Sequence, residues 1–300
     1  MKKMKHSKLT QSKYHYVFLA PHFIIFCIFF VVPIVYGIYV SFTRWDMFTP
    51  PQWIGFYNYQ TILFNSESTF HRQFWTGFRN TFQFVLMMVP IQIVVPLALA
   101  LALFAKPIGG RIFQGIFYIP TLFSISAAVL TWYFILHPGF GLLNNVVFTE
   151  HINWFGTQPF AWISILAVTT WWVIGLNMII YIAALHGIDD GILEYAKLDG
   201  ASGLRRLLYV YLPLIRLPLL FTVIASTASQ FNIFGQPLML TGGGPAESTH
   251  VLIMYIRTLA FGIGRPIAGL ASSMAVMLGL CIGILSVIQM RIIMKLDAHN

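Results

Sequence analysis

Long apolar runs recur along the whole chain, and the shorter segments between them hold most of the charged residues. Six runs are long enough to cross a hydrocarbon layer of about 30 Å, since an α-helix rises about 1.5 Å per residue. A β-barrel would instead show short segments of alternating polarity, so the runs predict membrane-spanning helices. The predicted helices cover Val17–Ser41, Thr81–Ala105, Phe113–Leu136, Phe160–Leu185, Leu214–Gln236 and Ile267–Ile293.

The composition agrees with a chain that has the lipid bilayer as its solvent. Of the 300 residues, 58% are hydrophobic and 9% are charged, whereas a soluble domain has about 25% charged residues. The first run is longer than the core of a secretory signal peptide and no small-residue cleavage site follows it, so we expect it to remain as a helix. We therefore predict an all-α membrane protein with one six-helix domain, residues 17–293, between tails at residues 1–16 and 294–300.

The net charge of +9 reflects topology rather than a surface for nucleic acid. Twelve of the 18 lysines and arginines lie in the two tails, in the loops that six helices place on the same side as the tails, or at the adjacent end of the last predicted helix. Five lie in the opposite loops, and Arg216 lies at the boundary between an inner loop and the fifth predicted helix. Since lysine and arginine concentrate in cytoplasmic loops, we predict a multi-pass protein of the cell membrane with both termini in the cytoplasm. Lipid is its expected surrounding, and nucleic acid is not an expected partner.

The inner loop at residues 186–213 has the most informative pattern in the chain. Its charged residues, among them Glu194 and Asp199, are interleaved with small ones. Ala196 and Ala201 would let another protein surface approach closely, and Gly200 can adopt the positive φ that ends a helix. The pattern predicts a short amphipathic helix, a glycine turn and a second helix that leads into the next span. On physical grounds alone, an ordinary charged connector is the alternative.

This loop resembles the EAA loop of binding-protein-dependent ABC importer permeases, in which Glu-Ala-Ala and Asp-Gly-Ala precede a Leu-Pro pair. The matching residues are Glu194, Tyr195, Ala196, Asp199, Gly200, Ala201, Leu212 and Pro213, with Tyr195 in place of the usual first alanine. The resemblance implies the type I ABC importer permease fold. It also implies that the loop, through Glu194, Ala196, Asp199, Gly200 and Ala201, couples the permease to an ATPase subunit. The expected partners are a second homologous permease, two ATPase subunits and an extracellular solute-binding protein.

Two outer segments, Trp53–Tyr59 and Leu240–Pro245, resemble the carbohydrate branch of that family, which includes maltose and glycerol-phosphate permeases. The resemblance implies import of a sugar or oligosaccharide by ATP-driven alternating access, with glycerol phosphate or another small solute as the alternative. No G-x-x-x-x-G-K-S/T phosphate loop occurs in the chain. We therefore expect no ATPase activity and no cofactor in this chain, with ATP and magnesium bound by the partner ATPase.

The same resemblance places the substrate site on the fourth and fifth predicted helices. On each helix the candidate residues share one face by their i, i+3 and i+4 spacing. An aromatic ring can stack on the C–H bonds of a sugar while an amide hydrogen-bonds to its hydroxyls. For each polar residue in a span, the alternative is a hydrogen bond to a neighbouring helix, typically about 0.6 kcal/mol. The candidate substrate-lining residues are Thr169, Trp172, Val173, Leu176, Ser226, Gln230 and Ile233.

Other classes of membrane protein lack support in the sequence. The histidines are scattered, and Cys27 and Cys281 lie within apolar runs, so we expect neither a metal site nor catalytic residues. A secondary transporter would need acidic residues deep within its spans, and no aspartate or glutamate lies there. A membrane-embedded enzyme would need clustered histidines or acids at one membrane face, and no such cluster is apparent.

Overall fold

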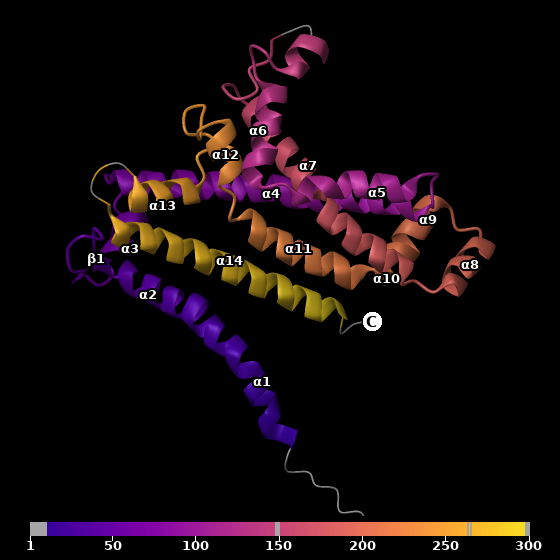
Figure 1. Cartoon of the computed structure of the whole chain (residues 1–300), viewed down its shortest axis with the longest axis horizontal. Coiled ribbons are helices and arrows are strands. Elements are labelled where there is room, and N and C mark those ends of the chain that lie inside the picture. Colours follow the sequence, from indigo (N-terminus) through magenta and orange to yellow (C-terminus); the bar gives the residue numbers. More distant parts are fainter. Residues whose placement is uncertain (1–10, 148–150, 263, 265, 298–300) are drawn as a thin grey trace, which may run out of the picture.

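The computed structural model describes residues 11–147, 151–262, 264 and 266–297, and these residues are mostly helical (Figure 1). Four helices are long and apolar enough to cross a membrane, and the number rises to six when each of two bent helix pairs is counted as one span. The six-helix, all-α architecture predicted from the apolar runs is therefore confirmed. Residues 1–10 of the predicted N-terminal tail, residues 298–300 of the C-terminal tail and the outer Arg265 lie outside the described residues.

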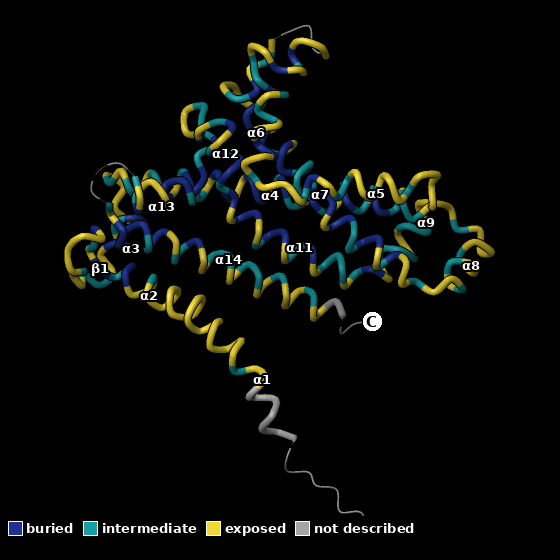
Figure 2. The backbone as a smooth tube through the Cα atoms, viewed as in Figure 1, coloured by how far each residue is buried: buried dark blue, intermediate teal, exposed yellow. Residues whose placement is uncertain are grey.

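The first span is one continuous helix built from α1 (Gln11–Phe26), a π-helical turn η1 (Cys27–Val31) and α2 (Val32–Ser41). It ends at Ser41, as predicted, but it begins within the predicted tail. Its apolar side chains are exposed over most of its length, and Figure 2 shows it leaving the bundle as an exposed rod. The α2 end packs against α14 (Ala268–Asp297), so this span is anchored to the rest of the chain at one end.

The helix α4 (Thr69–Phe104) is the central helix of the fold. The side chain of Ser68 caps it by accepting a hydrogen bond from a backbone N–H of the first turn. At about 1.5 Å per residue the helix is about 54 Å long, so it extends well beyond a hydrocarbon layer of about 30 Å. The apolar run predicts only the part from Thr81 onward, because residues 69–80 carry charged and polar side chains.

The third predicted span is broken rather than straight. The helix α5 (Gly110–Tyr118) continues through the 3-10 turn η2 (Ile119–Leu122) and then turns by 106° into α6 (Ile125–Leu136). Ser124 begins α6, because its side chain accepts a hydrogen bond from a backbone N–H of the first turn. Together with the π-helical turn η3 (Leu143–Val147), α6 projects from the bundle as an arm (Figure 1). The run stays apolar enough on either side of the bend for composition to predict one span, and Pro120, close to the bend, is the kind of residue that often marks a kink.

The fourth span, α7 (Phe160–His186), matches its predicted range within one residue and packs along α4. The inner loop follows it, and the fifth span is the bent pair of residues 203–214 and α11, with an angle of 74° between them. The elements of this part of the chain are α8 (Asp190–Leu198), α9 (Gly203–Arg206), η4 (Leu207–Tyr211), α10 (Leu212–Leu214) and α11 (Arg216–Gln230).

The predicted fifth helix, Leu214–Gln236, is too long at its outer end. The helix α11 ends at Gln230, and the chain leaves the helical conformation over residues 231–234 before the short helix α12 (Gly235–Leu240) begins. Such a break at membrane depth is tolerated where the irregular backbone lines a cavity or is buried in protein. The break therefore marks this place as a candidate site.

The outer end of the molecule is built from the hairpin of β1 (Thr43–Arg44) and β2 (Gln52–Trp53), α3 (Tyr57–Leu63), α13 (Leu252–Phe261) and the start of α14. Asn58 on α3 donates to the backbone carbonyls of Ser41 and Thr43, both at 2.9 Å, and so fixes the end of the first span. The outer segment at residues 237–266 was expected to be a loop, whereas it contains α13. That helix has only 10 residues, too few to form an apolar run of spanning length.

Three clusters of buried apolar side chains form the core, and α4 contributes to all three. Phe84 lies in the cluster under the arm, Val85 in the cluster at the outer end, and Ala100 in the cluster beside α7 and the start of α11. Gly175 lets α7 approach α5 closely, because a Cβ atom there would lie 2.7 Å from the backbone of Phe117. Close helix packing of this kind holds the inner half of the bundle together.

The molecule has two distinct ends along the direction of its long helices. The inner-loop helix α8 lies at one end, and β1, α3 and α13 lie at the other (Figure 1). The first and last spans, α1–α2 and α14, both have their inner ends directed toward the α8 side (Figure 1).

Candidate functional site

A cleft of about 530 Å³ lies where α7 meets the break between α11 and α12. Its wall contains five of the seven candidate substrate-lining residues, namely Thr169, Trp172, Val173, Gln230 and Ile233. The two helix faces that sequence periodicity singles out therefore lie opposite each other at one cleft. We call this feature the central cleft.

The structure does not place the other two candidates, Leu176 and Ser226, in the central cleft. Leu176 lies two turns further along α7 than Thr169, where the surface is open and its side chain is 58% exposed. Ser226 is buried, and its hydroxyl accepts a hydrogen bond from Asn177 Nδ2 at 3.3 Å. Shared helical spacing gives the direction of a side chain correctly, but it does not show how far along the helix a cleft extends.

Buried amides join three helices beside the central cleft. Gln230 Nε2 donates to Gln92 Oε1 at 2.8 Å, and Asn177 Nδ2 donates to the backbone carbonyl of Gln92 at 3.0 Å and to Ser226. We call these four residues, Gln92, Asn177, Ser226 and Gln230, the amide cluster. It ties α4, α7 and α11 together, as the alternative interpretation of the intramembrane polar residues predicts. An N–H of the Gln230 side-chain amide is therefore already hydrogen-bonded within the protein, although the residue also lines the cleft.

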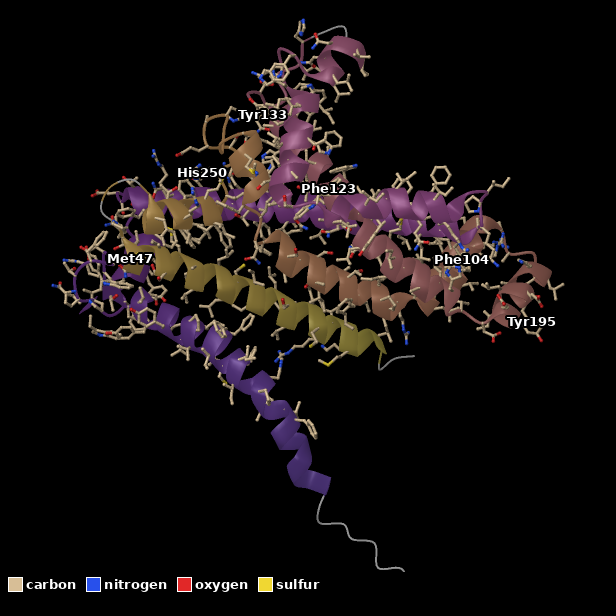
Figure 3. The ribbon with its side chains drawn as sticks, in the orientation of Figure 1. Met47, Phe104, Phe123, Tyr133, Tyr195 and His250 are labelled. Carbon is tan, nitrogen blue, oxygen red and sulfur yellow. The ribbon has the colours of Figure 1, made fainter. Side chains whose placement is uncertain are left out.

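Trp172 connects the central cleft to the bend in the third span. Its Nε1–H donates to the backbone carbonyl of Phe123 at 3.0 Å. Phe123 lies between η2 and α6, close to the middle of the molecule where the arm departs (Figure 3). The hydrogen bond satisfies a carbonyl that the broken helix leaves without a helical partner. The indole thus forms one wall of the cleft and holds the bend beside it.

Several lining residues of the central cleft were missed by sequence reasoning, because they lie on the arm and beyond the break. Gly235 fits against the arm closely, since a Cβ atom there would lie 2.6 Å from Ile125 Cδ1. The glycine and proline of the Gly235–Pro237 segment, placed inside an apolar run, are the signal that could have indicated a broken helix. The missed lining residues are Ile125, Ser126, Ser229, Asn232, Phe234, Gly235, Gln236, Leu238 and Met239.

The inner loop forms the helix and glycine turn that its sequence predicts. Asp189 caps α8 by accepting a hydrogen bond from a backbone N–H of the first turn. At the other end Gly200 has φ of +67°, and its N–H donates to the carbonyl of Lys197 at 3.1 Å. The N–H of Ala201 donates to the carbonyl of Ala196, also at 3.1 Å. This pair of backbone hydrogen bonds is a Schellman motif, in which the αL residue is usually glycine.

The side chains of α8 form an exposed surface at the inner end of the molecule. Glu194 and Asp199 are exposed, and Tyr195 and Leu198 expose 71% and 82% of their surface. Figure 3 shows Tyr195 at the extreme end of the molecule. Exposed apolar residues beside charged ones are typical of a surface that contacts another protein. The five candidate coupling residues therefore lie together on one exposed helix and turn.

The helix α8 is separated from the bundle by a second cleft, of about 710 Å³. The ends of α4 and α7 form its far wall, and residues of both charge signs, including Lys106, Glu194 and Arg206, line it. Within the part of the chain that the structure describes, no three His, Cys, Asp or Glu side chains are placed to hold a metal ion. The helix α8 is therefore held away from the bundle along this cleft.

The outer segment at residues 241–250 is held against α4 and α13. Asn80 Nδ2 donates to the backbone carbonyls of Glu247 at 2.8 Å and His250 at 3.0 Å. The imidazole ring of His250 lies 4.0 Å from the ring of Tyr255, and its Nε2 is buried without a hydrogen-bond partner. Burial lowers the pKa of His250, although the negative charge of Glu247 opposes the shift. Burial and Glu247 raise the pKa of Tyr255 to about 12, so that group stays neutral.

We expect this outer segment to open more readily as the outer pH falls below about 6.5, the ordinary pKa of histidine. The folded protein binds a proton on His250 less readily than the unfolded chain, so stability falls as the pH drops from 6.5 toward the lower folded-state pKa. Amide exchange across residues 241–250, corrected for its intrinsic pH dependence, should be faster at pH 5.5 than at pH 7.5. His250→Phe keeps the aromatic contact without titrating, so it should remove this difference. An equal difference in the variant would rule out His250 as its cause.

Comparison with known proteins identifies the family to which this chain belongs. Residues 62–297 match the family described as binding-protein-dependent transport system inner membrane component. The probable starch degradation products transport system permease protein AmyD of Thermoanaerobacterium thermosulfurigenes is 30% identical over 291 residues, 95% of this chain and 96% of that protein. The lactose transport system permease protein LacF of Rhizobium radiobacter is 33% identical over 229 residues, 72% of this chain and 74% of that protein.

A solved structure has the same fold. It belongs to a bacterial ABC transporter involved in the import of the acidic polysaccharide alginate, and its chain superposes with a TM-score of 0.79. The superposition covers 93% of this chain and 94% of that chain at 21% sequence identity. At this identity the likeness concerns the fold, and it confirms the permease fold that the inner loop predicts.

Proposed function

Because the chain belongs to the family of binding-protein-dependent transport system inner membrane components, we propose that it is the ABC importer permease that carries a sugar or oligosaccharide across the membrane. Its relatives include permeases of transport systems for starch degradation products and for lactose. The observation that carries the proposal is the chemistry of the central cleft. An indole ring, hydroxyls and amides line it, and none of its described lining residues is charged. These groups suit the C–H faces and hydroxyls of a neutral sugar.

The central cleft is less suited to glycerol phosphate or another small anion. A phosphate is typically bound by arginine, whose guanidinium matches its oxygens. Arg257 lies over the ring of Phe234 at 5.7 Å, and Arg257 is not among the residues that line the cleft. Arg216 lies at the inner end of α11, whereas the cleft lies at the outer end of that helix. The geometry therefore favours the neutral substrate.

The partners follow from the exposed inner loop and from the family. A separate ATPase subunit would bind ATP and magnesium and would contact α8 and its glycine turn, including Glu194, Ala196, Asp199, Gly200 and Ala201. A second homologous permease would complete the membrane path, two ATPases would drive it, and an extracellular solute-binding protein would deliver the sugar. The exposure of Tyr195 and Leu198 at the tip of α8 supports the ATPase contact, and the family description supports the binding protein.

The path of the chain explains how ATP hydrolysis could act on the substrate. The helix α8 leads through α9, η4 and α10 into α11, and the outer end of α11 forms part of the central cleft. A displacement of α8 by the ATPase would therefore be transmitted along α11 to the place where the sugar binds. This chain contributes no covalent step, and its role is to open the cleft to each side of the membrane in turn.

Transport by the purified complex in proteoliposomes tests the proposed function. The complex, with its ATPases and binding protein, would be supplied with labelled maltose, maltopentaose, lactose, raffinose and glycerol 3-phosphate in separate reactions. We expect ATP-dependent accumulation of at least one sugar and none of glycerol 3-phosphate, with a hydrolysis-deficient ATPase variant as the control. Accumulation of glycerol 3-phosphate without any sugar would overturn the assignment.

The proposed orientation gives a separate prediction. A reporter enzyme that is active only outside the cytoplasm should be silent when fused after Asn300 and active when inserted after Asn65. Asn65 is exposed between α3 and α4, at the end of the molecule opposite to α8. The distribution of lysine and arginine supports this orientation. Strong activity of the C-terminal fusion would contradict it, and a second reporter that is active only in the cytoplasm serves as the control.

A further inference from the structure

A groove of about 420 Å³ lies on the outer part of α4. It is lined by Trp75, Thr76, Phe78, Arg79 and Phe82. Trp75 and Phe82 are 45% and 38% exposed, so their rings are accessible from outside the chain. We call this feature the outer groove.

The aromatic rings of the outer groove form a continuous series that ends beside the central cleft. The ring centroids of Trp75 and Phe78 are 6.0 Å apart, and those of Phe78 and Phe82 are 6.4 Å apart with the rings nearly parallel at 11°. Phe82 in turn lies 6.4 Å from Phe231. Phe231 is the first residue of the break after α11, and it lies between Gln230 and Asn232, which line the central cleft. The ring series of the groove therefore ends next to two residues that line the cleft.

We propose that the outer groove is a second sugar-binding site, occupied by an oligosaccharide on its way to the central cleft. The proposal rests on the proposed function, because it takes the cargo to be a sugar. Exposed rings can stack on the C–H faces of sugar units, and the Arg79 guanidinium and Thr76 hydroxyl can hydrogen-bond to their hydroxyls. Residues 75–82 extend for about 10 Å along the helix, which is longer than one aromatic ring. The groove can thus hold more than one sugar unit at a time.

The chemistry of the groove argues against a simple anchor at the membrane surface. Aromatic residues and arginine do gather at membrane interfaces, where each anchors its helix in the headgroup region. Here the rings contact one another, and their series ends at Phe231, which is fully buried within the protein rather than exposed to lipid. An anchor at the membrane surface does not require such a connection to the core beside the central cleft.

Protection of a single cysteine tests the proposal. Cys27 and Cys281 would be replaced by serine, and Thr76→Cys would be introduced into the complete complex in proteoliposomes. Its labelling by a membrane-impermeant maleimide would be measured with and without each panel sugar that the wild-type complex transports. We expect a transported sugar to slow labelling about three- to tenfold, which corresponds to about 70–90% occupancy by mass action. Ser66→Cys, at an exposed position outside the groove, is the control and should show no protection.

Two ring variants separate sugar binding from structural support. Phe82→Ala should bring the Thr76→Cys labelling rate to within twofold of its value without sugar, whereas Phe82→Tyr should keep the protection. The yield of assembled complex should be unchanged in both. Transport of a sugar without protection of Thr76→Cys, or equal protection of Ser66→Cys, would overturn the outer groove and leave the proposed function intact. A low yield with Phe82→Ala and full protection in the remaining complex would show a contact between subunits instead. Transport of none of the sugars by the wild-type complex would overturn the proposed function and this site with it.

Discussion

Replacing Gly200 with valine is expected to abolish ATP-driven uptake while the chain still inserts into the membrane. Gly200 has φ of +67°, where a non-glycine residue costs about 1–2 kcal/mol and a β-branched one is a severe outlier. No other atom lies within 4 Å of a Cβ atom at this position, so the effect would come from the backbone and not from a clash. Losing the turn would also break two backbone hydrogen bonds, each worth about 0.5–1.5 kcal/mol net. The exposed turn has little else to hold it.

The expected readout is more than a tenfold loss of uptake, together with loss of the ATPase stimulation that the loaded binding protein causes. Gly200→Asp should behave similarly, since it adds a negative charge to the proposed docking surface. Gly200→Asn is the conservative control, because asparagine tolerates the left-handed conformation best among residues with a side chain. Gly203→Ala is the positional control, since Gly203 is exposed within α9 with open space around it. Stimulated ATPase activity near the wild-type value in Gly200→Val would show that the turn is not needed for coupling.

Trp172→Ala is expected to lower uptake about tenfold or more, and this is the second large effect. The change removes a stacking surface from the central cleft, and such aromatic contacts are worth about 0.5–1.5 kcal/mol beyond their area. It also removes the donor for the Phe123 carbonyl, a hydrogen bond worth about 0.5–1.5 kcal/mol net. Trp172→Phe should have an intermediate effect, because it keeps a ring in the cleft and loses only the N–H donor.

Leu176→Ala is the matched control on the same helix. Sequence periodicity places Leu176 beside Trp172, whereas the structure places it outside the central cleft with its side chain exposed. We therefore expect normal uptake from this variant. The yield of complex after detergent extraction distinguishes a substrate role from a packing role. Low yield of Trp172→Ala with normal uptake per assembled complex would show that the indole supports the fold and does not contact the substrate.

The parts of the fold that sequence predicts well are those whose signal is local. The inner turn is one such part, because Gly200 and its flanking alanines form the Schellman motif within a few residues. Straight spans are another, and α7 ends within one residue of its predicted end because an apolar run stops there. The size of the bend before α6, 106°, could not be predicted in this way, since an apolar run indicates a span but not its direction. It depends on how α6 packs against α7 and α12, and such contacts between distant segments leave little trace in composition.

The candidate site likewise has a part that local sequence signals predict and a part that depends on contacts between distant segments. The faces of α7 and α11 follow from helical periodicity, and they do meet at the central cleft. The contribution of α12 depends on a break that the apolar run conceals. The prediction for Gln230 from the sequence was also incomplete: its side-chain amide was expected to hydrogen-bond to a sugar. In the structure its Nε2 already donates to Gln92, a residue 138 positions away, and no periodicity connects the two.

The amide cluster determines how this permease can move. Hydrogen bonds between Gln92, Asn177, Ser226 and Gln230 join α4, α7 and α11, and separating these helices would leave amides unpaired in an apolar interior. We therefore expect the three helices to move together when α8 is displaced. The central cleft would then open on the side formed by α6 and α12, beyond the 106° bend before α6. Spin labels on α4 and α7 should keep a constant separation through the ATP cycle, while the distance from α6 to α4 changes.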